Sequence, residues 1–81
     1  MGDQVKKAFE NLGAVLQAAG LAASDVVRVN YYTTDVDELL AALGPPASEF
    51  FGDNLPASTL LGVARLAFPQ LKIEIEATAA R

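Results

Sequence analysis

Two glutamates near the end of the chain have the residue type and the spacing for chemistry. Glu74 and Glu76 stand two positions apart in the run LKIEIEAT, so both point to the same side of a strand. A carboxylate on a strand face can orient a water molecule for attack on an electrophilic carbon. The simpler interpretation is a solvated or subunit-facing strand surface. For Glu74 both interpretations stay open, and for Glu76 the surface interpretation is favoured.

Other routes to catalysis have little support in the sequence. The chain contains no histidine and no cysteine, so its serines have no imidazole to activate them, and disulfides are ruled out. The acidic residues Asp35, Asp37 and Glu38 suggest a metal site, but they are better explained as stabilising the start of a helix through its dipole. No glycine-rich phosphate loop is present. We therefore expect no metal and no cofactor.

The charge balance argues against nucleic acid as a partner. Six basic and ten acidic residues give a net charge of -4, and the basic ones are scattered. A phosphate backbone needs clustered positive charge. No apolar run is long enough to span a bilayer, and the N-terminus lacks the basic-then-apolar order of a signal peptide. The sequence therefore predicts a cytoplasmic protein that contacts neither nucleic acid nor membrane.

Five elements must position these side chains. Helical spacing of apolar residues, β-branched runs and strict alternation predict the order α-β-α-β-β. The expected elements are a helix over 3–19, a strand over 26–33, a helix that begins after a cap at Thr34 or Asp35, and strands near 59–66 and 71–78. The run Gly44-Pro45-Pro46 is expected to end or kink the second helix, because proline lacks the N–H and disfavours helix before it.

Alternation assigns the residues of the strands to two faces. In the last strand, Leu71, Ile73, Ile75 and Ala77 share the apolar face, and Lys72, Glu74, Glu76 and Thr78 share the polar one. In the first strand, one face carries Val27, Val29, Tyr31 and Thr33, and the other carries Val26, Arg28, Asn30 and Tyr32. The pattern predicts an α/β (α+β) two-layer sandwich with two helices on one face of a mixed sheet.

The composition points to an assembly. The chain is 81 residues long and 52% hydrophobic, which is more apolar material than a domain of this size readily hides. Small domains without disulfides or metals often gain stability by forming oligomers. We read the excess as subunit interface, although a dense core rich in alanine and leucine remains the alternative.

The chain resembles the Rid family, the reactive-intermediate deaminases also called YjgF. The residues 55–81 carry PAST, GVARL and IEIEA in the order of the family's C-terminal signature, P-A-x-[ST], V-A-R-L and [VI]-E-I-E-A. The residues 9–39 resemble the family's first helix, its A-A-G-L turn and its strand end. The resemblance implies the chorismate-mutase-like fold and a homotrimer whose sheets pack inward. It also implies a small-molecule ligand bound at the subunit interfaces.

Two departures from the family pattern shape the functional prediction. The chain, a single Rid-like domain over 1–81, begins at the first helix, without the family's N-terminal β-hairpin, and is either a fragment or a short form. The arginine that follows Pro-Ala in the family's deaminases is Ser58 here. By resemblance, Glu74 is the residue that positions the attacking water, Ser58 and Thr59 line the ligand pocket, and Arg65 is an outside candidate for it.

Three functions remain open. The favoured one is binding of a small metabolite, an enamine, imine or 2-oxo acid, at trimer interfaces with weak or no deaminase activity. Serine cannot reproduce the bidentate hold of arginine on a substrate carboxylate. The alternatives are an active 2-iminobutanoate/2-iminopropanoate-type deaminase and a structural or interaction module. The endoribonuclease (L-PSP) label that some family members carry is disfavoured, since the chain has neither a histidine nor a basic patch.

Overall fold

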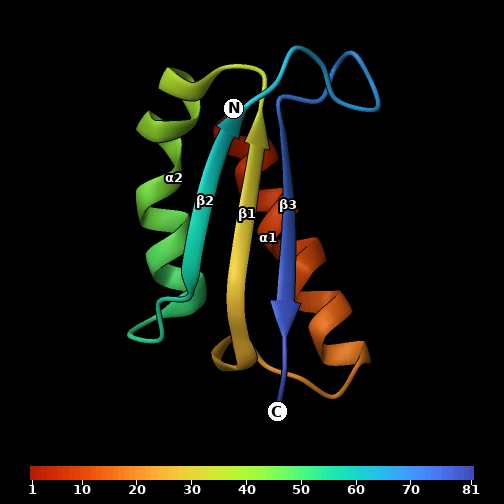
Figure 1. Ribbon diagram of the computed structural model, residues 1–81, viewed down its shortest axis with the longest axis vertical. Coiled ribbons are helices and arrows are strands. Elements are labelled where there is room, and N and C mark those ends of the chain that lie inside the picture. Colours follow the sequence, from red (N-terminus) through yellow and green to blue (C-terminus); the bar gives the residue numbers. More distant parts are fainter.

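Two helices cover one face of a three-stranded mixed sheet, and the other face is open (Figure 1). The computed structural model describes all residues, 1–81. The predicted order and the two-layer arrangement are confirmed. The elements are α1 (Gly2–Ala18), a short 3-10 turn (Ala23–Asp25), β1 (Val26–Thr33), α2 (Val36–Phe51), β2 (Ala57–Gly62) and β3 (Ile73–Ala79).

The strand β1 lies in the middle of the sheet. The strand order is β2-β1-β3, with β2 parallel and β3 antiparallel to β1. The parallel pair follows from its connection, because α2 returns the chain across the sheet before β2 begins. The two outer strands each leave one edge unpaired.

The core lies between the sheet and the helices, and its largest ring cluster is centred on Phe9. The Phe9 ring lies 6.4 Å from the Tyr31 ring of β1, and 5.0 and 5.9 Å from the rings of Phe50 and Phe51 in α2. The contacts of Phe9 with Tyr31 and Phe51 are edge-to-face, and the contact with Phe50 is tilted. Aromatic pairs add about 0.5–1.5 kcal/mol each to the burial of the rings. The remaining buried apolar residues are Val5, Leu16, Val26, Val29, Leu39 and Ile73.

A β-bulge corrects the predicted face of two residues at the start of β1. The register with β3 pairs Val26 with Ala79 and Arg28 with Thr78, so Val27 is the extra residue. The bulge returns Val26 to the core, where it is buried, and leaves Val27 exposed. Strict alternation places Val26 with Arg28 on the polar face and Val27 with Val29 on the apolar face, which the bulge makes wrong for both valines. From Arg28 onward the predicted alternation of β1 holds.

The prolines of α2 do not end the helix, so the first of the two expected outcomes, an end at this run, is wrong. The helix is continuous from Val36 to Phe51, with Pro45 and Pro46 inside it. Each proline removes one helical hydrogen bond and costs about 3 kcal/mol in a helix interior. Packing offsets this cost, because Leu39 before the prolines and Phe51 after them are buried in the same core. Asp35 caps the start as predicted, since its carboxylate accepts from the Glu38 N–H at 3.0 Å.

The bounds of the last two strands differ from the predicted ones because of the segments that each strand contacts. The strand β2 ends at Gly62 rather than near 66, because β1 ends at Thr33 and offers nothing further to pair with. The strand β3 begins at Ile73 rather than at 71, because the Lys72 N–H donates to the Gln4 side chain at 2.7 Å. The buried Thr33 hydroxyl donates to the Lys72 carbonyl at 2.7 Å, so this loop end is held from two sides.

Candidate functional site

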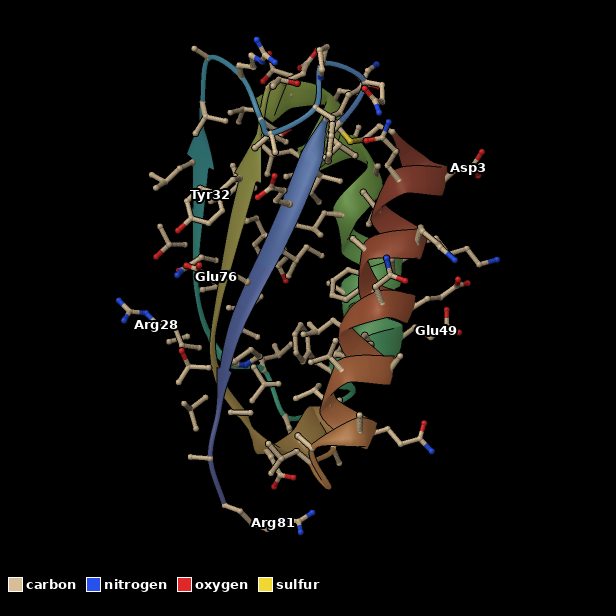
Figure 2. The ribbon with its side chains drawn as sticks, turned by 90° about the vertical axis from the view of Figure 1, so that its right-hand side faces the viewer. Asp3, Arg28, Tyr32, Glu49, Glu76 and Arg81 are labelled. Carbon is tan, nitrogen blue, oxygen red and sulfur yellow. The ribbon has the colours of Figure 1, made fainter.

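The open face of the sheet gathers the polar side chains of all three strands. The register places three rows of residues side by side on it, each with one residue from β2, β1 and β3. The rows are Ala57–Arg28–Thr78, Thr59–Asn30–Glu76 and Leu61–Tyr32–Glu74. Figure 2 shows Arg28, Tyr32 and Glu76 on this face, turned away from both helices. We call this surface the open face.

The carboxylate of Glu76 is fixed by two hydrogen bonds from the central strand. Its Oε1 accepts from Asn30 Nδ2 at 3.0 Å and from the Tyr32 hydroxyl at 2.9 Å. Hydrogen bonds to an ionised oxygen are shorter and stronger than neutral ones. Both bonds use the same oxygen, so Oε2 projects without a protein donor. Glu76 is thus an ordered carboxylate with one free acceptor atom.

These contacts shift the acid–base behaviour of both partners. The hydrogen bond from Asn30, followed by that from Tyr32, lowers the pKa of Glu76 below its ordinary value of 4.5, and Arg28 adds to the lowering. The hydrogen bond to Glu76 is the largest cause that raises the pKa of Tyr32 above its ordinary value of 10.0. Across neutral pH the pair is therefore a carboxylate and a neutral phenol that donates to it.

Arg28 is the one cation on the open face, and it has no carboxylate within ion-pairing distance. The ion pairs of the chain lie elsewhere, at Glu38 and Asp25. Arg28 lies one row from Glu76, and neighbouring rows on one face of a sheet are about 7 Å apart along the strand. The open face thus carries a positive and a negative group that interact electrostatically without forming an ion pair.

Two of the sequence-predicted site residues lie on the open face. Glu74 stands beside Tyr32, and Thr59 stands beside Asn30 in the next row. Glu74 is exposed, and the side-chain hydrogen bonds of this face go to Glu76 instead. Both carboxylate oxygens of Glu74 are therefore free to orient a water molecule.

Ser58 lies on the other side of the sheet. The register pairs it with Val29, a buried residue of the helix-covered face, so Ser58 and Thr59 point in opposite directions. Ser58 lines a groove between β2 and α2 together with Leu40, Phe51 and Leu55. No charged side chain lines that groove. Within one chain, Ser58 and Glu74 do not share a cavity.

Arg65 lies apart from Ser58 as well. It is exposed in the loop that follows Gly62, whereas Ser58 is near the start of β2. The four intervening strand residues span about 13 Å. The loop end of β2 and the start of β3 lie at the same end of the sheet, so Arg65 is nearer to the row of Glu74 than to Ser58.

The sequence placed Asn30 and Tyr32 on the mixed face of their strand but gave them no role. Alternation identifies the face, whereas the partner of each glutamate depends on the register between strands far apart in the chain. The bond from Tyr32 to Glu76 spans 44 positions. The register of β1 and β3 sets Asn30 opposite Glu76 but Tyr32 opposite Glu74, so the bond from Tyr32 to Glu76 is diagonal and depends on side-chain conformation as well as on register.

Comparison with known proteins gives a consistent picture. The family model of endoribonuclease L-PSP matches residues 1–81. A RutC family protein of Pyrococcus horikoshii is 39% identical over 77 residues, which cover 95% of this chain and 60% of that protein. A 2-iminobutanoate/2-iminopropanoate deaminase of Dermatophagoides farinae is 36% identical over 74 residues, covering 91% of this chain and 56% of that protein.

A solved structure agrees with these relatives. Escherichia coli TdcF with bound serine superposes with a TM-score of 0.87 at 32% identity, covering 99% of this chain and 64% of that one. The chain thus spans about 60% of the length of the curated relatives it matches. Neither helix of the structure has the length and apolar character needed to cross a membrane.

Proposed function

Because the chain belongs to the endoribonuclease L-PSP family, the family of the Rid and YjgF proteins, we propose that it binds a small metabolite at the interfaces of a homotrimer and hydrolyses it weakly or not at all. Its fold is the chorismate-mutase-like fold of that family. The metabolite class is an enamine, an imine or a 2-oxo acid. This class is suggested by a relative named for 2-iminobutanoate and 2-iminopropanoate and by a homologue with bound serine.

The observation that carries the proposal is that no charged side chain lines the groove around Ser58. Substrates of this class are carboxylates, and a guanidinium holds a carboxylate by two parallel hydrogen bonds. By the sequence resemblance, Ser58 stands where the family's deaminases have arginine, and no charged side chain lines the groove around it. A substrate held without this anchor binds more weakly and is poorly oriented towards a water molecule, so both affinity and rate fall.

The open face of the sheet supports the proposal of a homotrimer. A sheet covered by helices on one side only leaves its second face to water unless another molecule packs there. On this face Leu61 is 48% exposed beside the Tyr32 ring. Light scattering at micromolar concentration tests the assembly, with three times 8.5 kDa as the expected mass. A well-folded monomer would contradict the homotrimer.

Release of ammonia from an enamine generated in situ, such as 2-aminoacrylate, tests the catalytic part. We expect a rate at least about a hundredfold below that of an arginine-containing relative, in the range lost when one transition-state donor is removed. Ser58→Arg is the matched gain-of-function variant, and Ser48→Arg, in the same groove but on α2, is its control. A rate for the unmodified chain equal to that of the relative would contradict the proposal.

An active deaminase is the second candidate, and the exposure of Glu74 favours it. Both of its oxygens are free, as positioning a water molecule requires. In this role Glu74 orients the water, and Thr59 contributes a hydroxyl from the neighbouring row. Arg65, in the loop at the same end of the sheet, is then the candidate for the substrate carboxylate. Glu74→Gln would abolish such activity, and Arg65→Gln would raise the KM.

A further inference from the structure

The open face contains two opposite charges that are each left incomplete by their own chain. Glu76 is held by Asn30 and Tyr32 through Oε1, and its Oε2 has no donor. Arg28 projects from the same face without an ion pair. The guanidinium is more weakly hydrated than an ammonium, which makes arginine well suited to charge pairs at interfaces. Both groups therefore have capacity for a partner that comes from outside the chain.

The charges are also divided between the two halves of the open face. The β3 half carries Glu74 and Glu76, and the β1 half carries Arg28. Two copies that stack β3 on β3 would bring carboxylates together, and like charges in contact across an interface cost several kcal/mol. A contact that sets the β3 half of one copy against the β1 half of the next avoids this repulsion. A two-fold contact also allows such pairing, but only a head-to-tail contact builds the proposed trimer. Repeated with closure, such a contact forms a ring.

We propose that Arg28 of one copy donates to Oε2 of Glu76 of the next copy, and that this pair fixes the head-to-tail register of the assembly. The proposal rests on the oligomer of the proposed function and adds the contact that specifies it. Asn30 and Tyr32 act as positioning residues, because they prevent the carboxylate from turning its free oxygen back to its own chain. Burial of the pair by neighbouring Tyr32 and Leu61 side chains strengthens it by removing water.

The test compares the dissociation of the assembly in a set of charge variants. Arg28→Glu and Glu76→Arg each place like charges in contact, and each is expected to raise the dissociation constant at least about tenfold. The double variant Arg28→Glu/Glu76→Arg restores the opposite charges and is expected to recover most of that loss. Glu76→Gln keeps an oxygen for Asn30 and Tyr32 while removing the charge, so it isolates the pairing from folding. Dilution series followed by light scattering or mass photometry give the constants.

Glu49→Arg is the matched control, because it makes the same charge change on the helix layer, on the opposite side from the open face (Figure 2). It should leave the dissociation constant unchanged. Dissociation constants that stay within twofold in both single variants would overturn the inference while the oligomer stands. If the double variant does not recover the assembly although circular dichroism shows the native fold, the inference is also overturned. An unmodified chain that is a monomer would overturn both the inference and the oligomer.

Discussion

The two faces of the sheet are built in different ways. The helix-covered face is apolar and closely packed, with Leu39 and Val5 fully buried in the core. The open face has few contacts of its own, and its one ordered group, Glu76, depends on two side-chain hydrogen bonds. Packing therefore holds the fold from one side, and the other side is left for polar groups arranged by strand register. Substitutions on the two faces should differ accordingly.

Leu39→Ala tests the covered face and should have the largest effect. Leu39 has no exposed surface, and truncation of such a side chain costs about 2–5 kcal/mol of unfolding free energy. Thr59→Ala on the open face is the comparison and should change it by less than about 0.5 kcal/mol. Urea denaturation measures both. Equal losses for the two variants would contradict the division between the faces.

Thr33→Val tests the junction between the faces, where the loop before β3 is held. Valine keeps the shape but removes the hydroxyl that donates to the Lys72 carbonyl at 2.7 Å. Loss of a buried hydrogen bond of this kind costs about 1–3 kcal/mol. Hydrogen exchange should also speed up at the start of β3. Thr34→Val, at the exposed neighbouring position, is the control and should leave exchange at β3 unchanged.

Tyr32→Phe tests the open face itself and should have the smallest effect on stability. The variant removes one of the two donors to Glu76, so the pKa of Glu76 should rise towards its ordinary 4.5. Carboxyl carbon NMR shifts recorded against pH measure this change. Leu61→Ala removes a side chain from the same row without touching the hydrogen bond. An unchanged Glu76 pKa in Tyr32→Phe would contradict the arrangement described for the open face.

The pH dependence of the unmodified chain follows with a defined sign. The pKa of Glu76 is depressed in the folded state, so its contribution to stability is present above about 4.5 and is lost as the pH falls through the folded value. The pKa of Tyr32 is raised, so its contribution is present below about 10 and is lost as the pH rises through the folded value. Thermal scans from pH 3 to 11 should show both losses. Burial raises the pKa of Tyr31 as well, so Tyr31 adds to the alkaline loss, and Tyr32→Phe should reduce that loss without removing it.

Sequence patterns predicted the covered face better than the open one. Apolar spacing identified both helices and the alternation of β1 and β3, because burial repeats with a fixed period. The bulge at Val26–Val27 and the continuation of α2 through Pro45 and Pro46 were missed, since each depends on packing against distant residues. The Glu76 contacts were missed for a related reason. A period of two assigns a face but not a partner across the sheet.

The central place of β1 has a consequence for how the chain folds. Both of its neighbours in the sheet, β2 and β3, come later in the sequence, and Gln4 near the start of α1 meets Lys72 across 68 positions. As the chain leaves the ribosome, α1 can coil early because its contacts are local. The sheet must wait until β3 has emerged. Contacts between such distant segments slow folding relative to helical proteins of equal length. Until β2 and β3 have been synthesised, both edges of β1 are therefore unpaired, and during that interval the chain is prone to aggregation.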